Sequence, residues 1–181
     1  RAIATQLLEV LIYLHGHQPP VIHRDIKPSN ILLGPATDRN PGQAYLVDFG
    51  SVQTTHQEGT ITIVGTYGYM PPEQFSGKAH PASDLYSLGA TLVYLLIRLH
   101  PADLPVKRGQ MEFEVSYLIS DLHSEGLRHL MQNWLIYLVH PSVVQRLMSA
   151  RLALDTSADE NLPLQSKQRP YAKPLGHRTK L

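Results

Sequence analysis

His23-Arg24-Asp25-Ile26-Lys27-Pro28-Ser29-Asn30-Ile31-Leu32-Leu33 is the stretch from which the fold of this chain can be inferred, together with Asp48-Phe49-Gly50. The first segment combines a carboxylate, a lysine and an amide, and the second begins with another carboxylate. Short apolar runs lie on either side of these polar residues, as expected where small strands are joined by loops. The polar residues therefore define a candidate site that is carried on loops.

These residue types are the ones that transfer of a γ-phosphoryl group requires. The protein supplies an acid-base residue near the attacking hydroxyl, cations near the phosphate oxygens and oxygen ligands for Mg²⁺. Asp25 is the candidate acid-base residue and Lys27 the phosphate-directed cation. Asn30 and Asp48 offer the hard oxygen donors that Mg²⁺ prefers. The spacing thus provides every part of a phosphoryl-transfer site except a clamp for ATP.

Three motifs follow one another along the chain: His-Arg-Asp-x-Lys-Pro-x-Asn, then Asp-Phe-Gly, then Pro71-Pro72-Glu73. In this order they resemble the catalytic loop, the metal-binding loop and the Ala-Pro-Glu element of eukaryotic-type protein kinases. The segment from Gly65 to Phe75 resembles bacterial, cyanobacterial-like serine/threonine kinases. The resemblance extends from residue 1 to about residue 155.

The resemblance implies an α+β, mainly α-helical fold: the large (C-terminal) lobe of a protein kinase, with short β-strands around the catalytic and metal-binding loops. No Gly-x-Gly-x-x-Gly occurs in the 181 residues, so we expect the small lobe to be missing. We divide the chain into this lobe over residues 1–155 and a basic, Pro-containing linker or tail over residues 156–181. The implied activity is transfer of the ATP γ-phosphate to Ser or Thr hydroxyls of proteins, and we expect little activity from this chain alone.

The resemblance also assigns roles to residues of the site. Asp25 matches the catalytic base, and Lys27 matches the lysine that neutralises the γ-phosphate. Asn30 and Asp48 match the two Mg²⁺ ligands and, with Lys27, make up the predicted ATP site. Thr66 matches a threonine that lies near the base and the lysine and helps to fix the preference for Ser and Thr.

The resemblance to protein kinases also implies one regulatory role. Arg24 is expected to face the hydroxyl-rich segment between Ser51 and Val64. A phosphate there would bring about two negative charges that a guanidinium can pair with. Thr60 and Thr62 are the candidate phosphorylation sites.

Three further residues are predicted to support the site. Glu73 matches a buried glutamate that pairs with an arginine late in the lobe, and Arg146 falls at that place. A buried carboxylate needs such a partner. Pro72 stands where the family has alanine. Asp84 matches an aspartate that accepts backbone hydrogen bonds from the catalytic loop, and its position also suits a negative charge near a helix N-terminus.

Other interpretations of the sequence remain open. The chain could be a non-catalytic, truncated lobe that acts as an interaction module, although its site residues are intact. A small-molecule phosphotransferase of related fold is disfavoured by Thr66 and Pro-Pro-Glu, which belong to a peptide-docking segment. We interpret His23 and Phe49 as packing residues. A zinc site at His15-x-His17 is disfavoured because the second histidine follows the predicted helix end.

Composition limits the remaining function classes. Forty-three per cent of the residues are hydrophobic and 17% are charged, as in ordinary globular domains. The absence of cysteine excludes disulfides and thiolate metal sites, and we expect a cytoplasmic protein. A net charge of +1 without a basic stripe argues against nucleic acid as a ligand. The basic tail leaves open a membrane tether outside this chain.

Periodicity predicts the following elements. Helices are expected over residues 1–15, over 83–99 with Ser83 as the N-cap, weakly over 111–119, and from Val144 to Leu154. Another helix is expected to end before His140-Pro141, with one apolar face that comprises Leu127, Leu130, Met131, Trp134, Leu135 and Leu138. Short strands are expected at Val21-Ile22, Ile31–Leu33 and Tyr45–Val47.

Overall fold

Helices dominate the computed structural model, which describes residues 2–37, 42–54, 64–114 and 125–157. Four α-helices lie in these ranges: α1 (Ala2–His15), α2 (Pro81–Ile97), α3 (Glu125–Leu138) and α4 (Ala150–Thr156). Short 3-10 turns carry the motifs, at Pro28–Asn30, Phe49–Ser51 and Pro72–Ser76, and two more lie at Pro101–Asp103 and Val143–Gln145. The expectation of a mainly helical fold with a few short strands is confirmed.

The strands form antiparallel pairs of two. β1 (Val21–Ile22) pairs with β4 (Gln53–Thr54), β2 (Ile31–Leu33) with β3 (Ala44–Leu46), and β5 (Val106–Lys107) with β6 (Gln110–Met111). The first two predicted strands have the expected bounds, and the third begins and ends one residue earlier than predicted. The β2–β3 pair sets Ile31 opposite Leu46. The motif before β2, which contains Asp25 and Asn30, and the motif after β3, which begins with Asp48, therefore lie at the same end of this strand pair.

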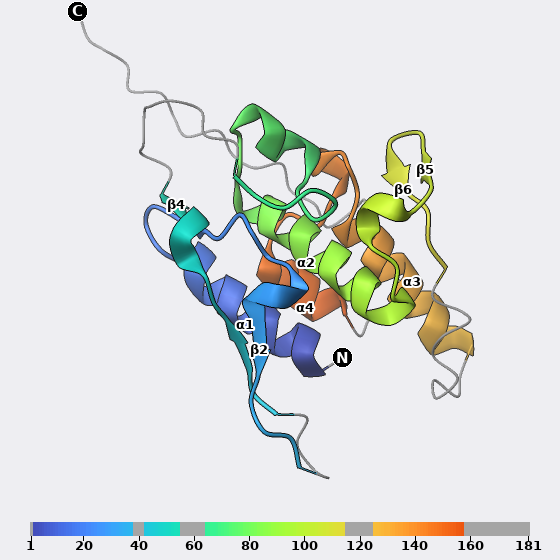
Figure 1. The fold of residues 1–181 in the computed structure, drawn as a ribbon, viewed down its shortest axis with the longest axis horizontal. Coiled ribbons are helices and arrows are strands. Elements are labelled where there is room, and N and C mark those ends of the chain that lie inside the picture. The colour runs from blue at the N-terminus through green and yellow to red at the C-terminus, as the bar shows by residue number, and fades with distance from the viewer. Residues whose placement is uncertain (1, 38–41, 55–63, 115–124, 158–181) are drawn as a thin grey trace, which may run out of the picture.

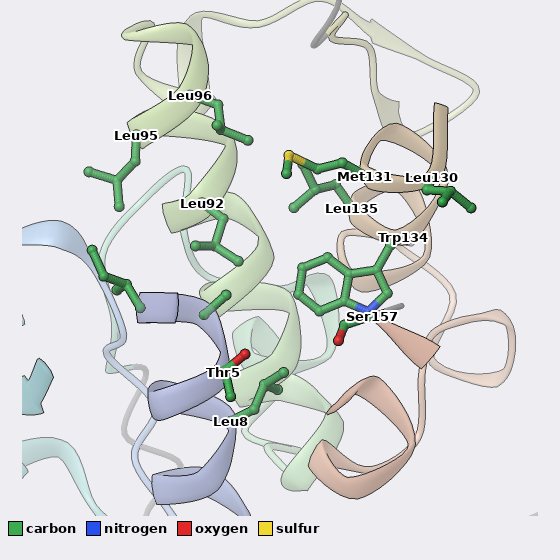
Figure 2. Close-up of a pocket in the computed structure, with 12 residues that line it drawn as sticks. Thr5, Leu8, Leu92, Leu95, Leu96, Leu130, Met131, Trp134, Leu135 and Ser157 are labelled. Carbon is green, nitrogen blue, oxygen red and sulfur yellow. The ribbon is translucent and has the colours of Figure 1, made fainter. Parts of the chain in front are cut away.

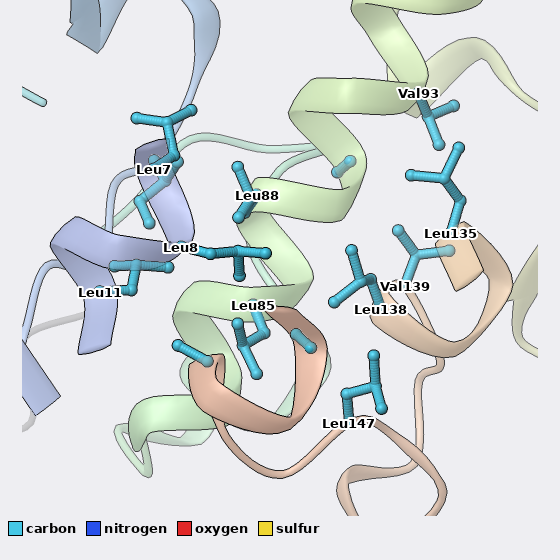
Figure 3. Packing of buried hydrophobic residues seen from close by; sticks show 14 of the residues in the cluster. Leu7, Leu8, Leu11, Leu85, Leu88, Val93, Leu135, Leu138, Val139 and Leu147 are labelled. Carbon is cyan, nitrogen blue, oxygen red and sulfur yellow. The ribbon is translucent and has the colours of Figure 1, made fainter. Parts of the chain in front are cut away.

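Helix α2 is the centre of the core, with α1, α3 and α4 packed around it (Figure 1). Leu7, Leu8 and Leu11 of α1 point toward Leu85 and Leu88 of α2 (Figure 3). Leu135 and Leu138 of α3 approach α2 from the other side (Figure 3). Because apolar residues surround α2 on most of its faces, ten of its residues are buried. This core is the base on which the loops of the site rest.

The start of α2 differs from the prediction. His80 is the N-cap, and Pro81 occupies the first helical position, where its missing N–H and fixed φ are tolerated. Ser83, the predicted N-cap, lies three residues further on, and its Oγ accepts a hydrogen bond from the His80 N–H at 3.1 Å. Serine is common both at the N-cap and at the third helical position, where its hydroxyl can accept the N–H of the N-cap residue. The prediction was wrong because Ser83 occupies the third helical position and not the N-cap.

A hairpin stands at the start of the predicted helix 111–119. Arg108 and Gly109 have φ values of 52° and 80°, which suit a two-residue turn between antiparallel strands. β6 therefore includes Met111, and residues 112–114 are irregular. The helix prediction is wrong for residues 111–114, and residues 115–119 lie outside the described ranges.

The last predicted helix is shorter than expected. A 3-10 turn, Val143–Gln145, ends at Arg146, whose backbone is extended at φ −80° and ψ 158°. Helix α4 begins only at Ala150, capped by Ser149, whose Oγ accepts a hydrogen bond from the Leu152 N–H at 3.1 Å. The chain leaves the helical conformation where the Arg146 side chain enters the core, as described below.

Within the described residues, no helix combines the length and apolar character needed to cross a membrane.

Candidate active site

The loop from His23 to Lys27 is hydrogen-bonded to Asp84, which lies in the first turn of α2. Its carboxylate accepts hydrogen bonds from the N–H groups of His23 and Arg24, both at 2.9 Å. Arg24 adopts a left-handed backbone conformation with φ 69°, which is uncommon outside glycine. The buried carboxylate therefore fixes a strained turn directly before Asp25.

Asp25, Lys27 and Thr66 form a closed triangle of polar contacts. The Lys27 ammonium lies 2.8 Å from Asp25 Oδ2 and donates to Thr66 Oγ1 at 2.8 Å. The Thr66 hydroxyl in turn donates to Asp25 Oδ1 at 2.7 Å. Residues 41 positions apart in the sequence thus share one small polar site.

Asn30 joins this triangle from the 3-10 turn that precedes β2. Its amide nitrogen donates to the Asp25 backbone carbonyl at 2.8 Å and to Asp25 Oδ2 at 3.2 Å. The Asn30 carbonyl accepts the Val47 N–H at 2.9 Å, which continues the β2–β3 pairing. Asn30 is therefore buried and fixed by both its side chain and its backbone.

Asp48 lies two residues after the end of β3. Its φ of 64° turns the chain, and its Oδ1 accepts the Gly50 N–H at 3.3 Å. Its side chain is exposed. Among the described residues, hydrogen bonds connect Asp25, Lys27, Asn30 and Thr66 with one another, whereas none connects Asp48 with this group.

The surroundings of Asp25 change its acidity. Burial acts to raise its pKa, but hydrogen bonds from Lys27, Thr66 and Asn30, with the charge of Lys27, outweigh that effect. The pKa of Asp25 therefore lies below its ordinary value. This carboxylate is ionised at neutral pH and is a hydrogen-bond acceptor there.

Arg24 contacts the beginning of the hydroxyl-rich segment. Its Nε donates a hydrogen bond to the carbonyl of Ser51. Thr60 and Thr62, the predicted phosphorylation sites, lie outside the described residues, as does the rest of the segment from residue 55 to residue 63.

Glu73 and Arg146 form an ion pair between distant parts of the chain. Arg146 Nη1 donates to Glu73 Oε1 at 2.6 Å, and Nη2 donates to Oε2 at 3.1 Å. The guanidinium is fully buried and also donates to the carbonyls of His140, Pro141 and Ala82. Burial acts to raise the pKa of Glu73, but the hydrogen bonds and the charge of Arg146 have the larger opposite effect. The pKa of Glu73 therefore lies below its ordinary value.

His23 and Phe49 contact each other edge to face, with ring centroids 5.0 Å apart. The His23 ring is buried, and its Nε2 lies 3.1 Å from the Val47 carbonyl. These contacts connect the loop before Asp25 with the turn after Asp48.

Two residues near the site were not singled out for their roles by sequence reasoning. His15 was considered only as a partner of His17, but its Nε2 lies 3.0 Å from Asp84 Oδ2, while His17 Nδ1 lies 2.9 Å from the Tyr13 carbonyl. Gln74 was included only in the segment from Gly65 to Phe75 and was given no role of its own, although it is buried beside the loop. No local pattern in the sequence indicated its role.

Asn30 and Asp48 fit a Mg²⁺ ion by their chemistry. Because the amide nitrogen of Asn30 donates to Asp25, its Oδ1 is the side-chain atom left for a cation. The exposed carboxylate of Asp48 offers a second hard oxygen. The described residues contain no group of three His, Asp or Glu side chains that could hold a metal. Mg²⁺ is commonly held by one or two protein ligands and substrate phosphates, so two ligands suffice.

An apolar cavity of about 220 Å³ lies elsewhere, between the beginning of α1, the second half of α2, and α3 (Figure 2). None of its lining residues is charged, and none of the predicted site residues contributes to it. The cavity therefore offers no charged group that could bind a phosphate. The lining comprises Ile3, Ala4, Thr5, Leu8, Leu92, Leu95, Leu96, Leu130, Met131, Trp134, Leu135 and Ser157.

Comparison with known proteins gives consistent matches. The family model described as protein kinase domain matches residues 1–157. Serine/threonine-protein kinase PknA of Nostoc sp. is 43% identical over 112 residues, which are 58% of this chain and 19% of that protein. Serine/threonine-protein kinase B of Synechocystis sp. is 34% identical over 164 residues, 83% of this chain and 26% of that protein.

A match outside bacteria is Aurora kinase A-A of Xenopus laevis, 34% identical over 135 residues, which are 68% of this chain and 31% of that protein. The chain thus spans between about a fifth and a third of the length of these three relatives.

Proposed function

Because this chain belongs to the protein kinase family, we propose that it forms the large lobe of a serine/threonine kinase that transfers the γ-phosphate of ATP to protein hydroxyl groups. The observation that carries this proposal is the contact of Asp25 with Lys27, Thr66 and Asn30. The lobe comprises about residues 1–155, followed by a linker. Since ATP is the donor, we place the reaction in the cytoplasm.

Asp25 acts on the hydroxyl of the protein substrate. A carboxylate oxygen can accept about two hydrogen bonds, so Oδ1 can accept one from the substrate in addition to that from Thr66. Asp25 orients the hydroxyl, whose oxygen forms a bond to the γ-phosphorus while the bond from this phosphorus to the β,γ-bridging oxygen breaks. Asp25 takes the hydroxyl proton. Because its pKa is lowered, it is a weak base, and we expect this proton to move late.

Lys27 neutralises charge on the transferred group. Its ammonium has three N–H donors, of which two are directed at Asp25 and Thr66. The third is left for an oxygen of the γ-phosphate. Thr66 fixes both partners at once, because its hydroxyl accepts from Lys27 and donates to Asp25.

Asn30 and Asp48 are the residues that would hold Mg²⁺. When bound, the ion neutralises charge on the phosphate oxygens during transfer. Asn30 is already fixed by Asp25, whereas Asp48 presents its carboxylate from an exposed turn. The 181 residues contain no Gly-x-Gly-x-x-Gly, so we propose that tight binding of ATP needs residues outside this chain and that the chain alone turns over little.

The test is phosphate transfer from γ-labelled ATP to a generic protein substrate by the full-length protein. Asp25→Asn should lower kcat by roughly 10²-fold or more, the scale of a lost general base. Asp103→Asn is the matched control, because Asp103 is exposed and outside the site. Equal activity of the wild type and Asp25→Asn, or no transfer by the wild type with Mg²⁺ present, would refute the proposal.

A further inference from the structure

We propose that Gln74 is a positioning residue that fastens the segment carrying Thr66 to the loop carrying Asp25. The inference rests on the proposed function, because it assigns Gln74 to the same site. Gln74 is 2% exposed and lies in the 3-10 turn Pro72–Ser76. Its side chain touches neither Asp25 nor Thr66 by any hydrogen bond described for it, so it acts through the backbone beside them.

The amide nitrogen of Gln74 bridges two backbone carbonyls. It donates to the carbonyl of Arg24 at 2.6 Å and to that of Val64 at 2.6 Å. Arg24 directly precedes Asp25, and Val64 lies two residues before Thr66. One neutral side chain thus uses both of its N–H donors to hold together two segments that are 40 residues apart.

This arrangement leaves a polar atom without a partner. Gln74 Oε1 is buried and has no hydrogen bond, one of two such side-chain atoms in the described ranges. A buried polar atom without a partner is costly, and each case in a native protein needs an explanation. An apolar side chain would avoid the unpaired oxygen but would leave both carbonyls without this donor. The bridge is therefore the reason for a glutamine at this position.

Gly65 gives an independent indication that the segments must stay close. A Cβ atom at this position would lie 2.5 Å from Gln74 Nε2 and 3.1 Å from the Arg24 carbonyl oxygen. Its φ of 130° is also unfavourable for other residues. The backbone at Gly65 therefore lies so close to the side-chain amide of Gln74 that only glycine fits there.

The bridge completes the fixation of Arg24. Asp84 holds the N–H of this strained residue, and Gln74 holds its carbonyl. Without Gln74, the turn before Asp25 and the segment before Thr66 lose their common donor. We expect the hydrogen bond from Thr66 to Asp25 to weaken, although neither residue has been changed.

The first experiment measures kinetics of the full-length protein carrying Gln74→Met, which keeps the length of the side chain and removes both donors. We expect kcat/KM for a peptide substrate to fall on the order of 10²-fold, the effect of a small misplacement of catalytic groups. KM for ATP should change less than about twofold, since the hydrogen bonds described for the Gln74 side chain go to Arg24 and Val64 and to none of Lys27, Asn30 and Asp48. Gly65→Ala should have the same pattern.

Gln132→Met is the matched control, because Gln132 Nε2 also donates to a backbone carbonyl, that of Phe113, at 2.7 Å but far along the chain from the site. This variant should keep the wild-type kinetics. If Gln74→Met keeps kcat/KM for peptide, or if it raises KM for ATP as strongly as it lowers peptide turnover, the positioning role is refuted.

A second experiment does not depend on activity. Amide hydrogen exchange of residues 24–25 and 64–66, followed by mass spectrometry in the 181-residue chain, should be faster in Gln74→Met and in Gly65→Ala than in the wild type, because the two segments lose their common donor. Unchanged exchange in both variants overturns the inference. If the full-length protein transfers no phosphate but the exchange is faster, the proposed function fails while the bridge stands. Gly65→Ala provides this measurement if Gln74→Met does not fold.

Discussion

Asp84 shows how one residue can serve both local and distant structure. It lies in the first turn of α2, where a negative charge is favourable near the exposed N–H groups. The same carboxylate accepts hydrogen bonds from the N–H groups of His23 and Arg24 and contacts His15 Nε2. The loop before Asp25 is therefore built directly on the central helix.

At the residue scale, Lys27→Met should raise the pKa of Asp25. Lys27 supplies both a hydrogen bond and a positive charge to this carboxylate. Because the folded-state pKa is lowered, the interaction stabilises the protein above the pKa of the unfolded chain and is lost as pH falls through the folded value. In the variant, which lacks this interaction, the Asp25 carboxyl should take up its proton at higher pH. Titration of the Asp25 carboxyl by ¹³C NMR measures the shift.

Lys107→Met is the control for this experiment, since Lys107 pairs with Glu112 at 3.5 Å on the surface. It should leave the Asp25 titration unchanged. A titration of Asp25 that is the same in wild type and Lys27→Met would mean that the ammonium does not lower this pKa.

At the scale of elements, the approach of α2 to α3 depends on Gly89. A Cβ atom there would lie 2.7 Å from Leu138 Cβ and 2.9 Å from Val139 Cγ1. Helices this close need a small residue at the contact, although glycine lowers helix propensity. Gly89 is therefore a packing residue within a helix that is otherwise rich in leucine.

Gly89→Ala should destabilise the fold. Overpacking of a core costs about 1–3 kcal/mol, which exceeds the gain of about 1 kcal/mol from the better helix former. Urea unfolding followed by circular dichroism measures the free energy of unfolding. Gly126→Ala in α3 serves as the control, because a Cβ there meets no atom within 4 Å and the variant should be neutral or more stable. A Gly89→Ala protein as stable as the control would show that the two helices can separate at little cost.

At the scale of the whole molecule, Glu73 and Arg146 join segments 73 residues apart. The pair ties the turn at Pro72–Ser76 to the chain between α3 and α4, and Ser83 of α2 adds a hydrogen bond to Glu73 at 2.8 Å. The ring of Tyr86 lies 5.0 Å from the guanidinium carbon. The turn that carries Gln74 is thus fixed by a fully buried charge.

Arg146→Met should lower the free energy of unfolding by about 3–5 kcal/mol, because it leaves Glu73 without its cation. The loss should be largest at neutral pH. Since the pKa of Glu73 is lowered in the fold, the contribution of the pair in the wild type is present above the unfolded pKa and declines as pH falls through the folded value. Urea unfolding at several pH values therefore should show the two proteins converging in acid.

Glu112→Gln, which removes a surface pair, should cost about 0–1 kcal/mol and is the control. If Arg146→Met unfolds no more easily than Glu112→Gln at neutral pH, the buried pair does not hold these segments together.

The sequence by itself determined the features that depend on neighbouring residues. The order of the three motifs indicated the family, the spacing of Leu7, Leu11 and Leu14 predicted α1, and short apolar runs predicted the strands beside the site. Apolar spacing and His140-Pro141 likewise indicated the end of α3. These signals are local, because helix and strand periods and turn residues are read within a few positions of the chain.

Only the tertiary structure decided the features that depend on contacts between distant residues. Burial of the Arg146 side chain interrupts the last predicted helix, and the hairpin at residues 106–111 replaces the start of another. The bridge of Gln74, the contact of His15 with Asp84 and the approach at Gly89 have no local signal. Each arises because a side chain satisfies a hydrogen bond, a charge or a packing limit set by a segment that the fold brings beside it, and local spacing carries no information about that partner.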